Sequence, residues 1–468
     1  MLKLTGITSL ILSVAALLGC ATTDAHQTAG VLSTYVVLGE NGTAIARAVT
    51  TDAQCPMIRI DGMKVQMNLR AAPAIEPLRP TRSAPADSKP SVFPVRTCEK
   101  SIPADTVQAT IGELSLPLPK KQIDRIVVIG DTGCRLKKSD NAYQACNDPD
   151  RYPFAKVAAA AAKWKPDLVV HVGDYEYREN KCPDNDPGCA GSPWGYGWDT
   201  WQADFFKPGS ALLQAAPWVL VRGNHESCSR AGQGWWRMLD SWPYLAGRDC
   251  NDAANDKVGD YSEPYAIPLG GGAQLIVFDS SNTKNSAFAP DDIRRTIYRD
   301  DYRKIEQLSR HADFNIMANH HPILGVFADN DAHGKVVLKP GNQGIQSVFG
   351  RINPLIIPPR IDVLLSGHLH VWQEVSFSSP HPTQFVAGFS GTMEDLVPLP
   401  EYLPPGTSPA PGAVIEHHSS WVNGFGYMTM ERKGPKQWKV RVWNGSGRQV
   451  NACDIDGRHS GCELAQVK

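Results

Sequence analysis

The fold is decided by the segment RIVVIGDTG (residues 125–133), in which a short apolar run ends in Gly-Asp-Thr-Gly (residues 130–133). An apolar run of this length, bounded by turn residues, predicts a buried strand. A second such run, residues 168–172, ends in Gly-Asp-Tyr-Glu-Tyr (residues 173–177), and the alanine-rich stretch 153–164 between the two runs favours a helix. Strand, helix and strand make a βαβ unit, so the sequence predicts an α/β fold.

Three later apolar runs also end in residues that can bind metals. They are 218–222 followed by Gly-Asn-His-Glu, 314–318 followed by Asn-His-His-Pro, and 361–366 followed by Gly-His-Leu-His. Sites in α/β sheets form just outside the carboxyl ends of strands, so we expect all five clusters to meet in one crevice. Each cluster alone is typical of a turn. Together they supply the imidazoles and the bridging carboxylate that a hydrolytic two-metal centre needs.

These motifs, in this order, resemble those of the calcineurin-like metallophosphoesterases and, more narrowly, of the purple acid phosphatases. The matching residues are Gly130-Asp131-x-Gly133, Gly173-Asp174-x-x-Tyr177, Gly223-Asn224-His225-Glu226, His320-x-Pro322 and Gly367-His368-x-His370. Two departures from the wider superfamily are consistent with the narrower family, namely Gly133 in place of a histidine and Tyr177 in place of Asp or Asn. The resemblance implies a four-layer α/β/β/α metallophosphoesterase sandwich, preceded by a small all-β, fibronectin-like domain.

The resemblance also implies seven side chains that hold two metal ions. The first ion would be held by Asp131, Asp174, Tyr177 and His370. The second ion would be held by Asp174, Asn224, His320 and His368, which makes Asp174 the bridge. Carboxylate and phenolate oxygens suit Fe3+, whereas two imidazoles and an amide oxygen suit a divalent ion, which would be Zn2+, Fe2+ or Mn2+.

Two of these assignments have a neighbouring alternative. Tyr175 lies two residues before Tyr177, and a tyrosine near a strand end is usually packed, but the three-residue step from Asp174 favours Tyr177. His320 and His321 would point to opposite sides of an extended segment, and the His-x-Pro spacing of the family selects His320. His321 is then left to packing or to the substrate side of the site.

The implied reaction is the hydrolysis of a phosphate monoester, of the acid phosphatase type, by in-line attack of a metal-bound hydroxide. His225 follows the ligand Asn224, so its protonated imidazole would lie beside the site as a general acid for the leaving oxygen. Glu226 would either orient His225 or cap the following turn. His333 lies in a loop where related enzymes place histidines near the substrate, and a solvated loop residue is its alternative reading.

Two other functions remain open at this stage. The same two-metal centre would serve a phosphodiesterase or a nucleotidase, because the loops decide which ester is accepted. A surface lipoprotein that keeps the fold without turnover is the alternative from another class. The second alternative is disfavoured because all seven matching positions carry residues competent to bind metal.

The overall composition restricts the partners of the chain. It has 468 residues, a formal net charge of −1, 42% hydrophobic residues and 20% charged residues, which is typical of a globular protein. At roughly 150 residues per domain, two or three domains are expected. The near-zero net charge disfavours binding of nucleic acid by a basic surface. The expected partner, a small phosphate ester, is what the resemblance to the phosphoesterases implies.

The N-terminus resembles a bacterial lipoprotein signal spanning residues 1–20. Lys3 precedes an apolar stretch, residues 4–18, that ends just before Cys20, the residue that would receive the lipid. The apolar stretch is shorter than the about 20 residues that a membrane span needs. The resemblance implies export to the bacterial cell envelope and a lipid anchor in the outer membrane or in another membrane facing the periplasm. A cleaved secretory signal with an incidental cysteine is the alternative.

The rest of the chain divides at residue 119. Residues 21–30 form a polar tether, and residues 31–118 predict a small β domain with hairpin turns at Asn41-Gly42 and Asp61-Gly62. Residues 119–468 form the catalytic domain.

The chain contains eleven cysteines, an odd number. With Cys20 assigned to the lipid, ten remain, and they can close as five disulfides in an oxidising compartment. We predict that sequence neighbours pair, as Cys55 with Cys98, Cys134 with Cys146, Cys182 with Cys189, Cys228 with Cys250, and Cys453 with Cys462. Zinc binding by these cysteines is disfavoured because no Cys-x-x-Cys pair is present.

Overall fold

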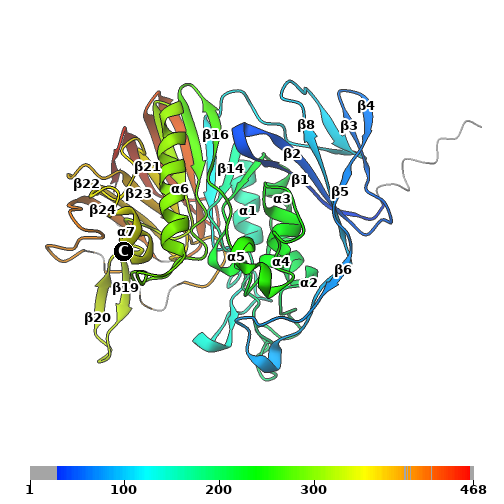
Figure 1. Cartoon of the computed structure of the whole chain (residues 1–468), viewed down its shortest axis with the longest axis horizontal. Helices are drawn as coiled ribbons and strands as arrows, with labels where there is room; N and C mark the ends of the chain where they lie inside the picture. The colour runs from blue at the N-terminus through cyan, green and yellow to red at the C-terminus, as the bar shows by residue number, and fades with distance from the viewer. Residues whose placement is uncertain (1–28, 395–396, 398, 401, 423, 464–468) are drawn as a thin grey trace, which may run out of the picture.

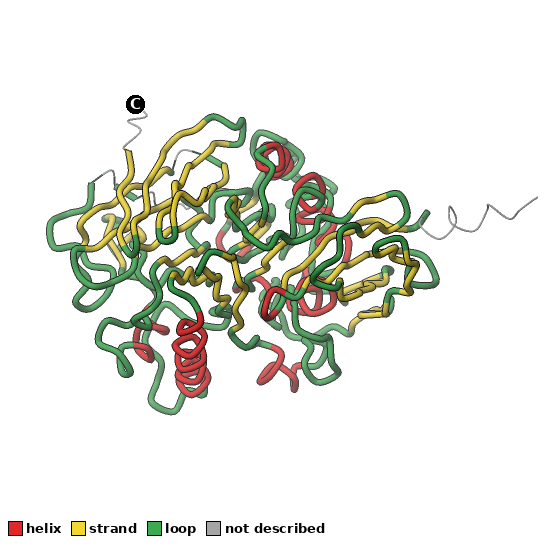
Figure 2. The backbone as a smooth tube through the Cα atoms, turned by 90° about the horizontal axis from the view of Figure 1, so that it is seen from above, coloured by secondary structure: helices red, strands yellow, loops and turns green. Residues whose placement is uncertain are grey.

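The computed structural model describes residues 29–394, 397, 399–400, 402–422 and 424–463. The predicted signal segment, Cys20 and all but the last two residues of the predicted tether lie outside the described residues. Two large mixed sheets run through the middle of the molecule with helices on either side, as Figure 1 and Figure 2 show.

The larger sheet contains eleven strands. In spatial order they are β28 (His459–Glu463), β27 (Gln449–Asp456), β26 (Gln437–Asn444), β25 (Gly426–Gly434), β11 (Arg125–Ile129), β14 (Leu168–His171), β15 (Trp218–Leu220), β1 (Val31–Leu38), β2 (Ala44–Thr50), β8 (Arg96–Ile102) and β5 (Asn68–Ala71). The predicted βαβ unit lies at its centre, because β11 and β14 are parallel and α1 (Phe154–Lys163) connects them.

The second sheet contains seven strands. In spatial order they are β16 (Tyr265–Gly270), β17 (Ala273–Val277), β18 (Phe314–Ala318), β21 (Val363–Ser366), β23 (Thr383–Ala387), β22 (Trp372–Phe377) and β24 (Ile415–Trp421). The four strands β17, β18, β21 and β23 are parallel to one another. β18 and β21 are the two predicted strands that precede the histidine motifs.

The two sheets pack face to face over a shared apolar core. Val128 of β11 and Val170 of β14 belong to the same buried cluster as Ile316 of β18 and Leu365 of β21. On the outer face of the larger sheet, α1 and α3 (Ser210–Leu213) cover the alternate strand residues. On the outer face of the smaller sheet, α6 (Arg294–Leu308) and α7 (Gln343–Phe349) do the same. These four layers confirm the predicted α/β architecture.

The N-terminal all-β region is joined to the larger sheet. Both predicted hairpins form, as β1 with β2 and as β3 (Met57–Ile60) with β4 (Met63–Gln66). β1 then pairs in parallel with β15, so β1, β2, β8 and β5 extend the sheet that carries the first three motifs. β3 and β4 lie in a separate four-stranded sheet with β9 (Ala109–Ile111) and β10 (Leu114–Ser115). A boundary between residues 118 and 119 stays a prediction.

Short elements complete the loops around the strand ends. Three two-stranded ribbons are formed by β6 (Ala74–Glu76) with β7 (Ser91–Phe93), β12 (Leu136–Lys137) with β13 (Ala142–Tyr143), and β19 (Phe327–Asn330) with β20 (Val336–Lys339). The short helices are α2 (Trp198–Trp201), α4 (Gly232–Gly234) and α5 (Asp256–Gly259). No helix in the described part of the chain combines the length and the apolar character that crossing a membrane requires.

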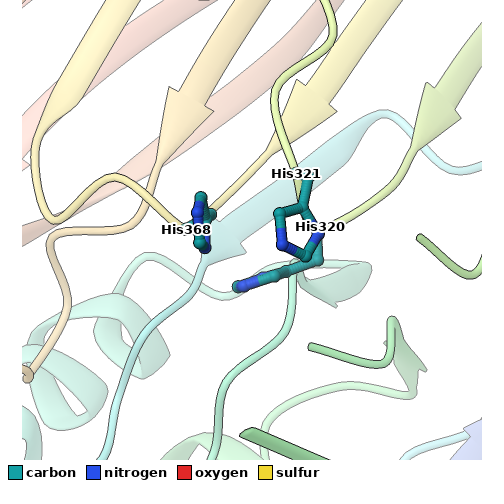
Figure 3. Close-up of side chains that lie close together, drawn as sticks. All are labelled: His320, His321 and His368. Carbon is teal, nitrogen blue, oxygen red and sulfur yellow. The ribbon is translucent and has the colours of Figure 1, made fainter. Parts of the chain in front are cut away.

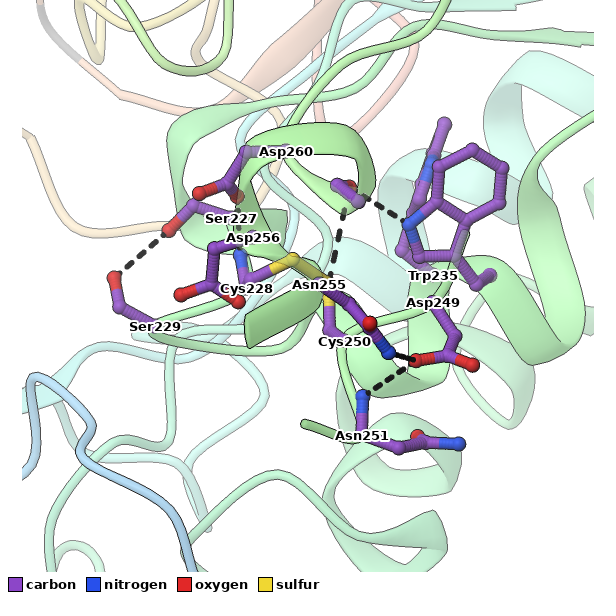
Figure 4. The surroundings of a disulfide bond; sticks show 12 residues. Ser227, Cys228, Ser229, Trp235, Asp249, Cys250, Asn251, Asn255, Asp256 and Asp260 are labelled. Carbon is purple, nitrogen blue, oxygen red and sulfur yellow. Dashed lines mark hydrogen bonds between the residues drawn. A yellow bond between two sulfur atoms is a disulfide. The ribbon is translucent and has the colours of Figure 1, made fainter. Parts of the chain in front are cut away.

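The described residues contain five disulfides, which join the same pairs of cysteines that we predicted: Cys55–Cys98, Cys134–Cys146, Cys182–Cys189, Cys228–Cys250 and Cys453–Cys462. Figure 4 shows the fourth pair, which connects the turn after the third motif to the loop before α5. The Cys228 N–H donates to the carboxylate of Asp260 at 2.6 Å. The disulfide and this hydrogen bond therefore hold the loop that follows His225.

Candidate metal centre

The five predicted motifs meet at one edge of the two packed sheets. The first three follow β11, β14 and β15 of the larger sheet, and the last two follow β18 and β21 of the smaller sheet. All seven predicted ligand side chains take part in one network of contacts at the meeting point. The convergence that strand polarity predicts is therefore present, although it draws on two sheets.

The side chains predicted for the first ion surround the phenol oxygen of Tyr177. This oxygen lies 2.9 Å from Oδ1 of Asp131, 2.7 Å from Oδ2 of Asp174 and 3.0 Å from Nε2 of His370. Nε2 of His370 lies 3.4 Å from Oδ1 of Asp131. Three oxygen donors and one imidazole nitrogen thus share one small volume.

The side chains predicted for the second ion surround the amide oxygen of Asn224. This oxygen lies 3.0 Å from Nε2 of His320 and 3.0 Å from Nδ1 of His368. Nε2 of His320 also lies 3.2 Å from Oδ2 of Asp174, the oxygen that Tyr177 contacts. Asp174 therefore lies between the two groups, where a bridging carboxylate is needed.

Three of these residues adopt backbone conformations that side chains rarely allow. The φ angles of Asp131, Asp174 and His368 are 53°, 62° and 70°, in the left-handed region. Such conformations cost on the order of 1–3 kcal/mol each and persist where surrounding contacts enforce them, often at functional sites. Here the Glu226 carboxylate accepts hydrogen bonds from the N–H groups of Asp174 and Tyr175, at 3.0 and 2.8 Å.

Glu226 also accepts a hydrogen bond from the Gly223 N–H at 3.1 Å and caps the short turn over residues 224–226. Between the two roles that the sequence left open, these contacts match the capping role. They also tie the second motif to the third, because the same carboxylate bonds the Asp174 N–H.

Two ligand imidazoles are oriented by backbone carbonyls. Nδ1 of His320 lies 2.8 Å from the Val172 oxygen, and Nδ1 of His370 lies 2.8 Å from the Met393 oxygen. A carbonyl accepts only from N–H, so each ring carries a proton on Nδ1 and turns Nε2 toward the centre. This is the arrangement in which histidine binds a metal.

The charges of the site call for bound cations. Burial would lower the pKa of His320, but the nearby Asp174 carboxylate raises it to about 9. Burial, Asp131 and Asp174 together raise the pKa of Tyr177 well above its ordinary value. Two buried carboxylates and a phenol within hydrogen-bond distance need compensating positive charge, which metal ions supply. Ligand atoms of Asp131, Asp174 and His320 lie within 4.8 Å of one another, close enough to share an ion.

His225 lies beside this centre and is held by residues that the sequence did not indicate. Its ring lies against that of Tyr177, with centroids 3.7 Å apart and the ring planes tilted by 31°. The backbone N–H of His225 donates to Oδ1 of Asp174 at 2.8 Å, and the ring atom Nδ1 lies 2.9 Å from Oε1 of Glu179. Arg230 places Nε 3.4 Å from the same Glu179 oxygen. All are buried or nearly so, and burial together with Arg230 lowers the pKa of His225 to about 4.

Tyr175 and His321 are the neighbouring alternatives to two of the predicted ligands. Tyr175 stacks on His171, and its hydroxyl donates to the Val221 carbonyl at 3.0 Å, so it packs away from the ligand oxygens. Figure 3 shows His321 beside His320 and His368. The His321 ring centroid is 4.2 Å from that of His368, and ligand nitrogens of the three histidines lie within 4.8 Å of one another.

His333 lies apart from the centre. It is exposed at the tip of the β19–β20 hairpin, where its N–H bonds the Asp331 side chain at 2.8 Å. A cavity of about 330 Å³ opens over the centre, and its lining includes Tyr177, His225 and His368. Because His333 is absent from the residues described as lining this cavity, a substrate contact by His333 forms no part of the function proposed below.

Comparison with known proteins agrees with this geometry. Residues 124–372 match the model of the family described as calcineurin-like phosphoesterase. Among solved structures, the purple acid phosphatase PPD1 from yellow lupin (Lupinus luteus) seeds aligns with a TM-score of 0.53 and 12% identity, over 93% of this chain and 75% of the lupin chain. PhoD aligns with a TM-score of 0.49 and 12% identity, over 92% of this chain and 90% of its own.

At 12% identity, the alignment with the lupin structure shows likeness of fold only. A search of curated proteins found no match. The family match covers more than half of the chain and contains all five motifs that meet at the candidate centre. The chain therefore belongs to the calcineurin-like phosphoesterase family, whose members are metal-dependent phosphoesterases.

Proposed function

We propose that this protein is a dinuclear-metal phosphatase of the acid phosphatase type that hydrolyses phosphate monoesters. The observation that carries the proposal is the position of Asp174, whose carboxylate contacts both Tyr177 and His320 and so links the two ligand groups. When bound, the ions would provide Lewis acidity toward the phosphate and the attacking water.

The donor chemistry distinguishes the two proposed metal positions. Asp131, Asp174, Tyr177 and His370 would hold Fe3+, because a phenolate is a hard, charged ligand. Asp174, Asn224, His320 and His368 would hold Zn2+, Fe2+ or Mn2+. The crowding of Tyr177 against two carboxylates supports the first assignment, since the phenol can lose its proton only where a strong cation replaces it.

His225 would transfer a proton to the leaving oxygen. The ring lines the cavity and is fixed between the Tyr177 ring and the Glu179 carboxylate. The Glu179 carboxylate beside Nδ1 favours a proton on that nitrogen and opposes burial and Arg230, which together lower the pKa of His225 to about 4. Nε2 is then left for the reacting group. Glu179 and Arg230 would therefore position His225 without touching the substrate.

The compartment proposed for the protein is the bacterial cell envelope, with Cys20 as the lipid-bearing anchor. Five disulfides support an oxidising compartment, since such bonds are rare in a reducing cytosol. Mass spectrometry of the mature N-terminus tests the anchor. A diacylated Cys20 is the expected species, and an unmodified terminus at another residue would exclude it.

Metal analysis combined with paired substrates tests the function. We expect two metal ions per chain, one of them iron, and faster hydrolysis of an aryl phosphate monoester than of the corresponding diester. Faster turnover of the diester would favour a phosphodiesterase on the same fold. A chain that binds both metals and hydrolyses neither ester would instead be a non-catalytic surface lipoprotein.

A further inference from the structure

The cavity over the centre has two unlike walls. One wall carries the side chains of Arg135 and Lys137, which lie in and next to β12. The other wall carries Phe327 from β19 and Leu369 and Val371 from the last motif. A volume of about 330 Å³ suits a small organic molecule and exceeds what a bare phosphate ion fills.

The basic wall is fixed to the metal centre by the backbone. The Leu136 N–H donates to the Tyr177 carbonyl at 3.0 Å, and the Asn180 N–H donates to the Leu136 carbonyl at 3.0 Å. On the other side, the Arg135 N–H bonds the Gln144 side chain at 2.9 Å, and the neighbouring Cys134 is disulfide-bonded. The backbone that carries the two cations is therefore anchored to that of Tyr177.

The charges on this wall are not fully compensated by the protein. The Asp140 carboxylate faces both cations, with Arg135 Nη2 at 2.5 Å and Lys137 Nζ at 3.0 Å, and Glu179 is the other carboxylate on which Lys137 acts. Nε of Arg135 is buried and has no hydrogen-bond partner among the described residues. Metal ions would neutralise the reacting phosphate, so the remaining positive charge at the basic wall is available to a different anionic group.

The apolar residues of the lining are packed from behind. Leu369 and Val371 belong to a buried cluster with Val326, Val386 and Leu399, which the β19–β20 hairpin partly covers. Figure 1 shows this hairpin projecting at the end of the molecule where the second sheet carries its motifs. A flat or aliphatic group that enters the cavity can lose water against this wall, which favours an organic substrate.

We propose that the cavity selects phosphate esters whose organic part is apolar and carries a second anionic group, bound by Arg135 and Lys137. This inference rests on the proposed phosphatase function and names its substrate class. The second group is a carboxylate or a second phosphate, both of which accept charge-assisted hydrogen bonds from guanidinium and ammonium groups.

Two aryl monoesters of equal size test the subsite, 4-carboxyphenyl phosphate and 4-carbamoylphenyl phosphate. The metal-loaded protein is expected to show a kcat/KM about tenfold higher for the carboxylate, the size of one good hydrogen bond to a charged group. The amide is the better leaving group, so chemistry alone would give the opposite order. A ratio of one or less overturns the inference.

Variants identify the residues responsible. The double variant Arg135→Gln, Lys137→Gln should bring the ratio close to one, whereas Asp140→Asn, which removes the competing carboxylate, should raise it. The matched control Lys163→Gln, Arg303→Gln removes the same charge from exposed helix positions and should leave the ratio unchanged. Equal ratios in the wild type, the Arg135 and Lys137 double variant and Asp140→Asn would overturn the inference.

Binding of the corresponding phosphonates, measured by calorimetry, separates this inference from the proposed function. Tighter binding of the carboxyl phosphonate without turnover of either ester would support the subsite and contradict the phosphatase. Turnover of both esters together with equal affinities for the two phosphonates would support the phosphatase and contradict the subsite. Failure of both phosphonates to bind the metal-loaded protein would overturn both.

Discussion

Oε1 of Glu179 lies 2.9 Å from Nδ1 of His225 and 3.4 Å from Nε of Arg230. Burial would raise the pKa of Glu179, but Arg230 and His225 hold it at about 2, so this carboxylate is ionised. The His225 ring thus lies between the Glu179 carboxylate and the Tyr177 ring at the edge of the cavity. His225 thus has one defined orientation before any substrate arrives.

His225→Ala should keep both metals and lose 10²- to 10⁴-fold in kcat, the usual contribution of a positioned general acid. Glu179→Gln should lose less, about tenfold, because it only positions the ring. Metal content and kcat are measured on the same preparations. Full turnover by His225→Ala would refute the acid role, and a loss of metal in that variant would point to a structural one.

Tyr177→Phe should abolish the visible charge-transfer band expected of tyrosinate on ferric iron, while the ring still lies against that of His225. Tyr175→Phe is the matched control, because the Tyr175 hydroxyl bonds the Val221 carbonyl and not a ligand. Absorption spectra and iron content of both variants decide the assignment. A band that survives in Tyr177→Phe, or that is lost in Tyr175→Phe, would reassign the phenolate.

Replacement of Cys228 and Cys250 by serine should lower the free energy of unfolding by about 2–4 kcal/mol, as expected for a disulfide with a sequence separation of 22. It should also weaken metal binding, because the disulfide holds the turn that follows His225. The matched control replaces Cys453 and Cys462, which join β27 to β28. That variant should lose stability and keep its metals, as measured by urea unfolding and metal titration.

The free energy of unfolding should fall as the pH drops from 6.5 to 4, in part because of His418. Burial, helped by His417, lowers the pKa of His418 from 6.5 to about 4. Within this window the unfolded chain binds a proton that the folded chain does not, which costs up to about 3 kcal/mol of stability at the acid end.

His418→Gln should remove this contribution and flatten the pH dependence of urea unfolding between the two values. His333→Gln, at an exposed hairpin tip, serves as control and should leave the dependence as it is in the wild type. An unchanged slope in His418→Gln would show that other groups account for the acid sensitivity.

The sequence predicted the α/β architecture and the convergence of the motifs because each follows a short apolar strand, and strand polarity brings such ends together. Glu179 and Arg230 gave no such signal, since they lie beyond the motifs and meet only through the folding of two loops. The roles proposed for Arg135 and Lys137 could not be predicted from the sequence for the same reason. Their importance depends on the cavity that the opposite sheet closes.

The pairing of strands that lie far apart in the sequence could not be predicted either. The hairpin of β1 and β2 could be predicted from the turn at Asn41-Gly42, because its register is local. The pairing of Val37 with Trp218 could not be predicted, because no residue in either strand indicates which strand it pairs with. The boundary at residue 119 stays a prediction, and β1 pairs with β15, which lies beyond it.

The pairing of β1 with β15 restricts the order in which the strands can pair during synthesis of the chain. Tyr35 of β1 donates to the carbonyl of Met238, 203 residues further along the chain. As the polypeptide emerges, one edge of β1 has no partner until β15, at residues 218–220, has followed, and an unpaired edge favours aggregation. The strand pairing of the N-terminal region therefore cannot be completed before β15 has been synthesised.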